Sequence, residues 1–81
     1  MEKSLFTEGY RTFLRQLRAA RKTAGLTQEE LAARLKETQS FVSKCERGER
    51  RIDVVELHSF CKAIGISFTD FTRRLAKSLA R

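Results

Sequence analysis

The sequence contains one histidine and two cysteines, which are few residues from which to build a metal site or a catalytic centre. His58 and Cys61 share one face of an expected helix, but a structural zinc ion needs a full set of ligands, and the only other Cys or His is the distant Cys45. The chain also shows no Cys-His-Asn order, no paired-carboxylate pocket and no glycine-rich phosphate loop. We therefore expect no metal, no cofactor and no enzymatic activity.

Long hydrophobic runs are also missing. No apolar stretch approaches the ~18 residues of a membrane-spanning helix, and there is no signal core or lipidation motif. A basic protein that lies on a membrane surface would need a strongly apolar exposed face, which the pattern does not show. Cys45 and Cys61 both fall on inner faces of expected helices. This position suits reduced thiols in a reducing compartment. We expect a cytoplasmic protein with no disulfide and no membrane attachment.

Charge is the most unbalanced property of the chain. Lys and Arg number 17 against 10 Asp and Glu, which gives a formal net charge of +7, and the pI is near 10.1. This excess favours a polyanionic partner such as nucleic acid, although a merely soluble basic protein would show it too. Eighty-one residues predict one domain with no second, ligand-sensing domain. We assign residues 1–9 to an N-terminal arm and residues 10–81 to the folded domain.

Capping residues and helical periodicity predict an all-α fold of five helices. The expected helices span about residues 10–24, 28–35, 39–47 and 54–64, and the last begins after Ser67. Thr27 with Glu30, and Asp53 with Glu56, have the spacing of capping boxes at two of the helix starts. Gly25 suits the end of the first helix, because glycine tolerates the left-handed conformation of a C-terminal cap.

The second and third expected helices are short and are joined by a turn at residues 36–38. Steps of about 100° per residue place Val42 and Cys45 on the inner side of the third helix. Its outer side carries Ser40, Ser43, Lys44 and Arg47. Neither helix is long enough to be stable alone, so both must pack against flanking helices. This is the arrangement of a helix-turn-helix, in which the second helix enters the major groove and reads base edges.

The chain contains the two stretches GLTQEELAARL and TQSFVSKCERGER. Together they resemble the Xre-type or phage-repressor-like helix-turn-helix family, which includes the lambda-type repressors and Cro. The resemblance covers about residues 14–71 and includes the Gly-Ile-Ser at residues 65–67. It departs at the turn, where Lys36 to Thr38 replace the usual glycine-containing turn, and at Ile52, where the family often has a proline. It implies a compact five-helix fold of the lambda-repressor type, with the helix-turn-helix formed by helices 2 and 3, and sequence-specific binding of double-stranded DNA.

The resemblance and the side-chain chemistry agree on the base-reading residues. Gln39, Ser40 and Lys44 fall on the positions that carry base contacts in the resembled repressors. A glutamine can pair with adenine N6 and N7, a lysine can donate to guanine O6 and N7, and a serine accepts several bases. We therefore expect these three residues to contact bases.

Phosphate contacts are expected on either side of this surface, from Gln28, Ser43, Arg47, Arg50 and Arg51. Gln28 opens a helix, where backbone N–H groups favour a phosphate; the less favoured alternative is an ordinary polar residue of a first turn. Ser43 and Arg47 flank the base-reading residues. Arg50 and Arg51 lie in a basic bend after the third helix, which we expect to follow the DNA backbone.

Two further assignments concern the first helix. The resemblance pairs Arg21 with Glu46 in a structural salt bridge that would fix the angle between helices. The outer face of the same helix is basic and carries Arg11, Arg15, Arg18 and Lys22. Such a face is usually only solvated, and contact with phosphate is the less favoured alternative.

The last helix carries an apolar stripe longer than the core should need: Phe68, Phe71, Leu75 and Leu79. In phage-repressor-like proteins the last helix is a frequent dimer contact, so the resemblance favours a dimer interface here. The alternative is that all four side chains fill the core of a monomer.

These observations predict a transcriptional regulator, favoured as a repressor, that binds a palindromic operator as a homodimer through the helix of residues 39–47. The same fold serves prophage regulators, antitoxins and controllers of restriction-modification genes, so a protein partner such as a toxin stays open. A protein-interaction module that retained the fold is a further alternative.

Overall fold

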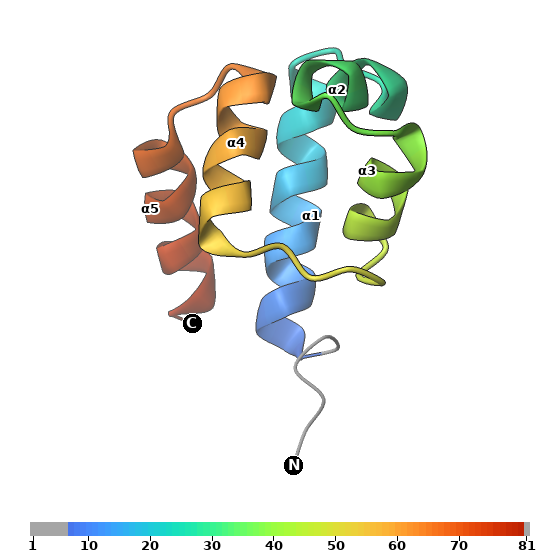
Figure 1. Ribbon diagram of the computed structural model, residues 1–81. Helices are drawn as coiled ribbons and strands as arrows, with labels where there is room; N and C mark the ends of the chain where they lie inside the picture. Colours follow the sequence, from blue (N-terminus) through green and yellow to red (C-terminus); the bar gives the residue numbers. More distant parts are fainter. Residues whose placement is uncertain (1–6, 81) are drawn as a thin grey trace.

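The computed structural model describes residues 7–80, and within them the chain forms five helices and no strand (Figure 1). The helices are α1 Glu8–Thr23, α2 Gln28–Leu35, α3 Gln39–Glu46, α4 Val54–Ile64 and α5 Phe68–Leu79. The all-α, five-helix prediction is confirmed. None of these helices is long and apolar enough to cross a membrane.

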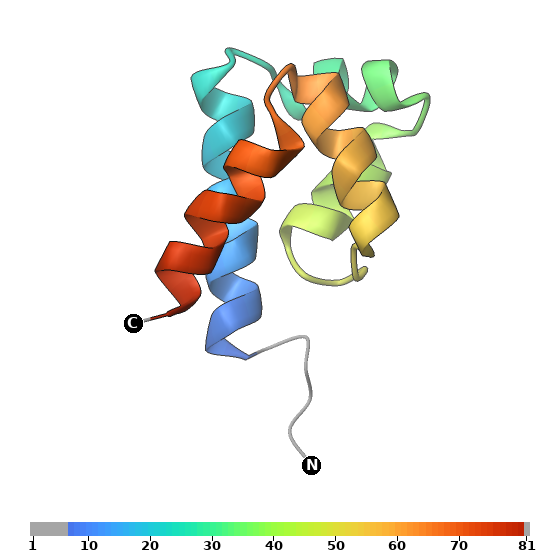
Figure 2. The same cartoon turned by 90° about the vertical axis from the view of Figure 1, so that its left-hand side faces the viewer.

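In the view of Figure 1, α1 lies between α2 and α3 on one side and α4 and α5 on the other. It packs against α3 and α5, while α4 packs against α2 and α5. The view in Figure 2 shows α5 lying along α1. The first turn of α1 meets the last turn of α5 at Gly9, where a Cβ atom would lie 3.4 Å from Leu79 Cδ2.

All five helices contribute to one hydrophobic core. Its buried residues are Phe13, Leu14, Leu17, Leu31, Ala32, Val42, Cys45, Ile52, Leu57, Phe60, Cys61, Ile64 and Phe71. Val42 and Cys45 have no exposed surface, as the helical periodicity predicted for the inner side of α3. Both cysteines are free thiols, and burial raises the pKa of each. The core thus holds the two short helices that could not be stable alone.

Each helix begins at a capping residue whose side chain accepts a hydrogen bond from the first turn. The capping residues are Thr7, Thr27, Thr38, Asp53 and Ser67. Complete capping boxes form at the starts of α2 and α4, with Glu30 and Glu56 as the reciprocal partners. Lys36 ends α2 in the left-handed conformation, with φ of 60°, so the turn keeps its shape although a lysine replaces the glycine usual in the resembled family.

In the described residues, the start of α1 differs from the predicted boundary, and the ends of α1 and α3 each differ by one residue. Helix α1 begins at Glu8 because the Thr7 hydroxyl accepts a hydrogen bond from the backbone N–H of Tyr10 at 3.1 Å. Glu8 and Gly9 therefore belong to α1 rather than to the predicted arm of residues 1–9, of which residues 1–6 lie outside the described residues. Helix α1 ends at Thr23 and α3 ends at Glu46, and the next residues, Ala24 and Arg47, are their C-terminal caps.

The predicted dimer stripe on α5 is divided between the core and the surface. Phe71 is only 3% exposed, and its ring meets that of Phe13 edge-on with centroids 6.2 Å apart. Phe68 and Leu75 are half-buried against the core, whereas Leu79 is 51% exposed. Phe71 is therefore a core residue that cannot also contact a second copy, which corrects its assignment to the dimer interface.

Candidate DNA interface

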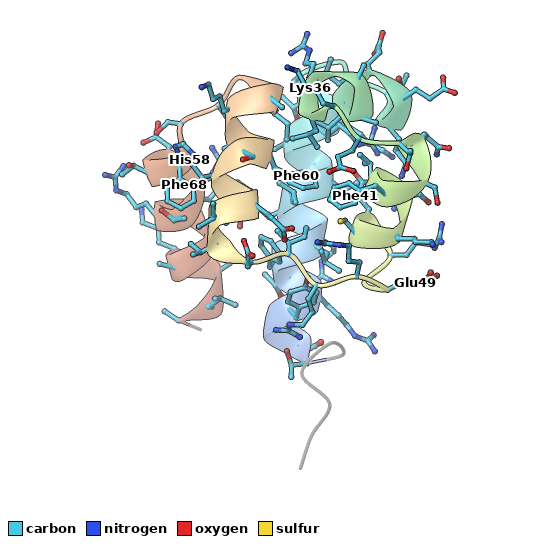
Figure 3. The ribbon with its side chains drawn as sticks, viewed as in Figure 1. Lys36, Phe41, Glu49, His58, Phe60 and Phe68 are labelled. Atoms are coloured by element: carbon cyan, nitrogen blue, oxygen red, sulfur yellow. The ribbon has the colours of Figure 1, made fainter. Side chains whose placement is uncertain are left out.

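Helix α3 presents a polar face to the solvent. The Thr38 hydroxyl caps the helix by accepting from the Phe41 N–H at 3.1 Å, and the side chains of Gln39, Ser40 and Lys44 are exposed. Phe41 lies between α3 and α4, where its ring is 6.3 Å from that of Phe60 (Figure 3). The three residues predicted to read bases are thus brought together on one side of a helix whose other side is fixed in the core.

A buried ion pair fixes the end of α3 against α1. Arg21 Nε donates to Glu46 Oε2 at 2.7 Å and Arg21 Nη2 donates to Glu46 Oε1 at 3.0 Å. The two side chains are only 8% and 4% exposed. Arg21 Nη1 also donates to the Leu26 carbonyl at 2.8 Å, so the same guanidinium holds the chain between α1 and α2. The predicted pair therefore joins α1, the α1–α2 connection and α3.

Gln28 extends this network to the surface of α3. Its Nε2 donates to Glu46 Oε1 at 2.9 Å, and its Oε1 accepts from Gln39 Nε2 at 2.7 Å. An ionised carboxylate can only accept hydrogen bonds, so Glu46 requires the NH₂ end of Gln28 and leaves the oxygen end for Gln39. The orientation of the Gln39 amide is therefore set by a charge in the interior. Sequence reasoning assigned Gln28 to phosphate and did not identify this link.

Arg50, predicted to contact phosphate, is engaged within the protein. Its two terminal nitrogens donate to the Glu56 carboxylate at 3.0 and 2.7 Å, and Nη1 also donates to the Arg51 carbonyl at 2.8 Å. Its guanidinium lies over the Phe41 ring, 4.9 Å from the centroid. Arg50 therefore ties the bend between α3 and α4 to both helices. No local sequence pattern indicates this role, because the partners come together only through tertiary packing.

The other predicted phosphate contacts lie near the end of α3. Arg47 is exposed and donates to Glu49 Oε2 at 2.9 Å and to the Ser43 hydroxyl, so Ser43 and Arg47 lie together. Arg51 is also exposed, with its guanidinium 4.5 Å from the centroid of the Tyr10 ring. Both arginines remain close enough to the solvent to exchange or add an anionic partner.

The helix-turn-helix is the class that this geometry defines: two short helices joined by a tight turn, the second with a polar face presented to the solvent and an apolar face in the core. The chain belongs to the Xre-like helix-turn-helix family, whose family model, described as helix-turn-helix, matches residues 17–71. The family resemblance found in the sequence is thereby confirmed. This is a family of regulators, not of enzymes.

Named relatives agree with this family. Over 50 residues the chain is 40% identical to "Uncharacterized HTH-type transcriptional regulator y4dJ" of Sinorhizobium fredii, and the match covers 62% of this chain and 65% of that protein. An XRE-family like protein from Pseudomonas syringae pv. tomato has a similar structure, with a TM-score of 0.83 and 47% identity over 86% of this chain and 85% of that chain. The clp gene regulator ClgR from C. glutamicum has a TM-score of 0.73 and 31% identity, over 84% and 88% of the two chains.

Proposed function

We propose that this protein is a cytoplasmic, sequence-specific regulator of transcription that binds double-stranded DNA. It places α3 in the major groove and acts as a repressor on a palindromic operator, to which it binds as a homodimer. The observation that carries the proposal is the exposed polar face of α3, on which Gln39 is oriented from the interior through Gln28 and Glu46. A face with no partner to recognise would not need a side-chain amide of fixed polarity.

The orientation of Gln39 suits adenine. One N–H of its amide is donated to Gln28, which leaves the second N–H and both lone pairs of Oε1 for a ligand. Adenine offers the complementary pair in the major groove, with N7 as an acceptor and the N6 amino group as a donor. Gln39 can therefore contact adenine without giving up its bond to Gln28. Lys44, on the same exposed side of the helix, would donate to guanine O6 and N7, with Ser40 between them.

Phosphate contacts hold the helix in the groove in this proposal. Ser43 and Arg47 lie together toward the end of α3, and Arg51 lies in the bend after it, beside the Tyr10 ring; in this proposal the DNA backbone passes these side chains. Gln28 keeps one N–H free for phosphate beside its internal bonds. Arg50 acts indirectly, since its bonds to Glu56 and the Arg51 carbonyl hold the bend in place.

The proposed repression follows from occupancy: a protein bound at a site that overlaps a promoter excludes other proteins from it. An antitoxin or a controller of restriction-modification genes would use the same interface and differ in its protein partner and target genes. A protein-interaction module is the rival from another class. It gives no reason for the joint exposure of Gln39, Lys44 and Arg47 on a protein of charge +7.

Selection of binding sites from random duplexes, followed by fluorescence anisotropy on the enriched site, tests the proposal. We expect two half-sites related by two-fold symmetry, with centres about 10 base pairs apart or a multiple of that. Because bound phosphates release counterions, affinity should fall by orders of magnitude between about 50 and 200 mM salt. Failure to bind any duplex at low salt would refute DNA binding, and binding without enrichment of a site would refute sequence specificity.

A further inference from the structure

The outer face of α1 carries three arginines that lie outside the helix-turn-helix formed by α2 and α3. Arg11, Arg15 and Arg18 recur at helical spacing, all are exposed, and none forms an ion pair within residues 7–80. The one side-chain hydrogen bond among them runs from Arg15 to the Thr12 hydroxyl at 3.3 Å. Like charges at this spacing destabilise a helix. An unneutralised row of this kind therefore calls for a reason outside the stability of α1.

A hollow of about 340 Å³ lies beside this row, between α1 and the end of α3. Arg11, Arg15, Arg18 and Arg47 surround it. Leu14 and Gly48 form part of its lining, and the two approach so closely that a Cβ atom on the glycine would lie 3.4 Å from Leu14 Cδ1. Glu46 also lines the hollow, but its carboxylate is already bound by Arg21 and Gln28. Four arginines thus surround the hollow, and the single carboxylate in its lining is already bound by other residues.

We propose that Arg11, Arg15 and Arg18, together with Arg47, bind phosphates of the DNA backbone beyond the base pairs read by α3. This rests on the proposed DNA binding and extends it from the helix-turn-helix to the length of α1. Arg47 joins the two surfaces, because it caps α3 and also lines the hollow (Figure 1 shows α1 and α3 as neighbours). Binding would exchange its exposed bond to Glu49 for a bond to phosphate.

DNA fits this row better than an acidic protein does. At about 1.5 Å per residue, Arg11 to Arg18 span roughly 10 Å, which equals about three steps of the duplex at 3.4 Å each along its axis. A regular row of guanidinium groups matches a regular row of phosphates, and guanidinium can bind phosphate through two parallel hydrogen bonds. Because the hollow adjoins both α3 and α1, one DNA strand could run from the groove occupied by α3 to the arginines of α1.

The test compares the triple variant R11Q/R15Q/R18Q with a matched control, K62Q/R74Q/K77Q. The control removes the same charge from exposed residues of α4 and α5 that line no part of the hollow. Binding to the selected operator is titrated with salt, on a duplex that ends at the site and on one extended by about a turn on each side. We expect the slope of log K against log salt to weaken by about 0.9 for each phosphate that is no longer bound, hence by about 2 to 3 per protomer in the triple variant and by clearly less in the control.

Duplex length gives the second readout. Wild type and control should lose affinity when the flanks are removed, whereas the triple variant should bind both duplexes alike and keep its base preferences. Equal slopes and equal length dependence in the two variants would overturn the inference, and would leave an acidic protein as the partner of this face. If wild type bound no duplex, the proposed function would fail as well, so the two failures are distinguishable. Circular dichroism melts check that both variants fold.

Discussion

On the surface of α3, single side chains differ in how far the fold has oriented them. Gln39 is held by Gln28, which is held in turn by the buried Glu46. Lys44 is exposed and forms no ion pair with any other residue in the described range. Ordering a free lysine on binding costs side-chain entropy, whereas a pre-oriented glutamine has given up most of that freedom on folding. The proposed adenine contact is therefore the more rigid of the two.

Base-reading and backbone-holding residues should respond differently to truncation. Gln39→Ala and Lys44→Ala should each cost about 1 to 3 kcal/mol on the preferred site and relax the preference at the base pair concerned. Arg47→Ala should weaken binding to all sequences more evenly, because phosphate carries no base identity. Anisotropy titrations on the operator and its single-base variants measure both effects, with Arg74→Ala as the control. Identical specificity profiles for all three variants would contradict the assignment.

Glu46 should matter to the fold itself. Glu46→Ala leaves Arg21 as an unpaired charge in a site where its side chain is only 8% exposed, so we expect a loss of about 3 to 5 kcal/mol in the free energy of unfolding. The control is Asp70→Ala, which removes the exposed pair with Arg73 and should cost about 1 kcal/mol or less. Urea unfolding measures both. A Glu46→Ala midpoint equal to that of the control would show that the buried pair contributes no more than a surface one.

Elements were predictable where their signals are local. Capping boxes at Thr27 and Asp53 lie within one turn of sequence, so the starts of α2 and α4 fell where predicted. The start of α1 was misplaced because the stretch before Tyr10 has no apolar periodicity, although Thr7 is a capping residue. The exposed face of α3 followed from the 3.6-residue period. Links set by packing, such as that from Arg50 to Glu56, have no sequence signature.

The bend between α3 and α4 should make stability depend on pH. The Arg50 guanidinium, together with the Asp53 backbone N–H, holds the pKa of Glu56 below its ordinary value of 4.5. A carboxyl group whose pKa is lower in the folded state stabilises the fold at pH values above its ordinary pKa. This stabilisation is lost as the pH falls through the pKa of the folded state. Glu56→Gln should therefore lower the melting temperature at pH 7 and lower it progressively less below about pH 4.

Thermal melts from pH 7 to pH 3 measure this difference. The control is Glu49→Gln, because the Glu49 pKa is also lowered, by Arg47, but that pair is exposed on both sides and should contribute little. A constant gap between wild type and Glu56→Gln across the whole range would show that Glu56 acts through its shape, and not through the charge that Arg50 and the Asp53 N–H stabilise.

In the whole molecule, the recognition helix α3 is too short to specify a DNA site by itself. An α3 of 8 residues touches only about four or five base pairs, which is too few to single out one site in a genome. A second half-site read by a second copy supplies the missing specificity. The surface that joins two copies must be self-complementary about a two-fold axis and must leave both α3 helices facing the same side of the duplex.

The described residues leave three large apolar side chains exposed for such a surface. Leu79 at the end of α5 is 51% exposed, and Val54 and Val55 at the start of α4 are 66% and 71% exposed. The ends of the helices that carry them lie toward the same end of the molecule (Figures 1 and 2). With Phe71 in the core, the proposed dimer surface on α5 narrows to Leu79 and the exposed edges of Phe68 and Leu75. The two valines form the alternative surface on α4.

Leu79→Glu and Val55→Glu, each studied by sedimentation equilibrium, separate these surfaces. If α5 forms the dimer, Leu79→Glu should give a folded monomer with weakened operator binding, because a charge in an apolar interface has no partner, and Val55→Glu should remain dimeric. A monomer from Val55→Glu alone would move the interface to α4, and two unaltered dimers would place it elsewhere. Leu79 Cδ2 also lies close to Gly9, so circular dichroism must accompany each run. Unfolding of Leu79→Glu would mean that this leucine serves the contact between α1 and α5 rather than a second copy.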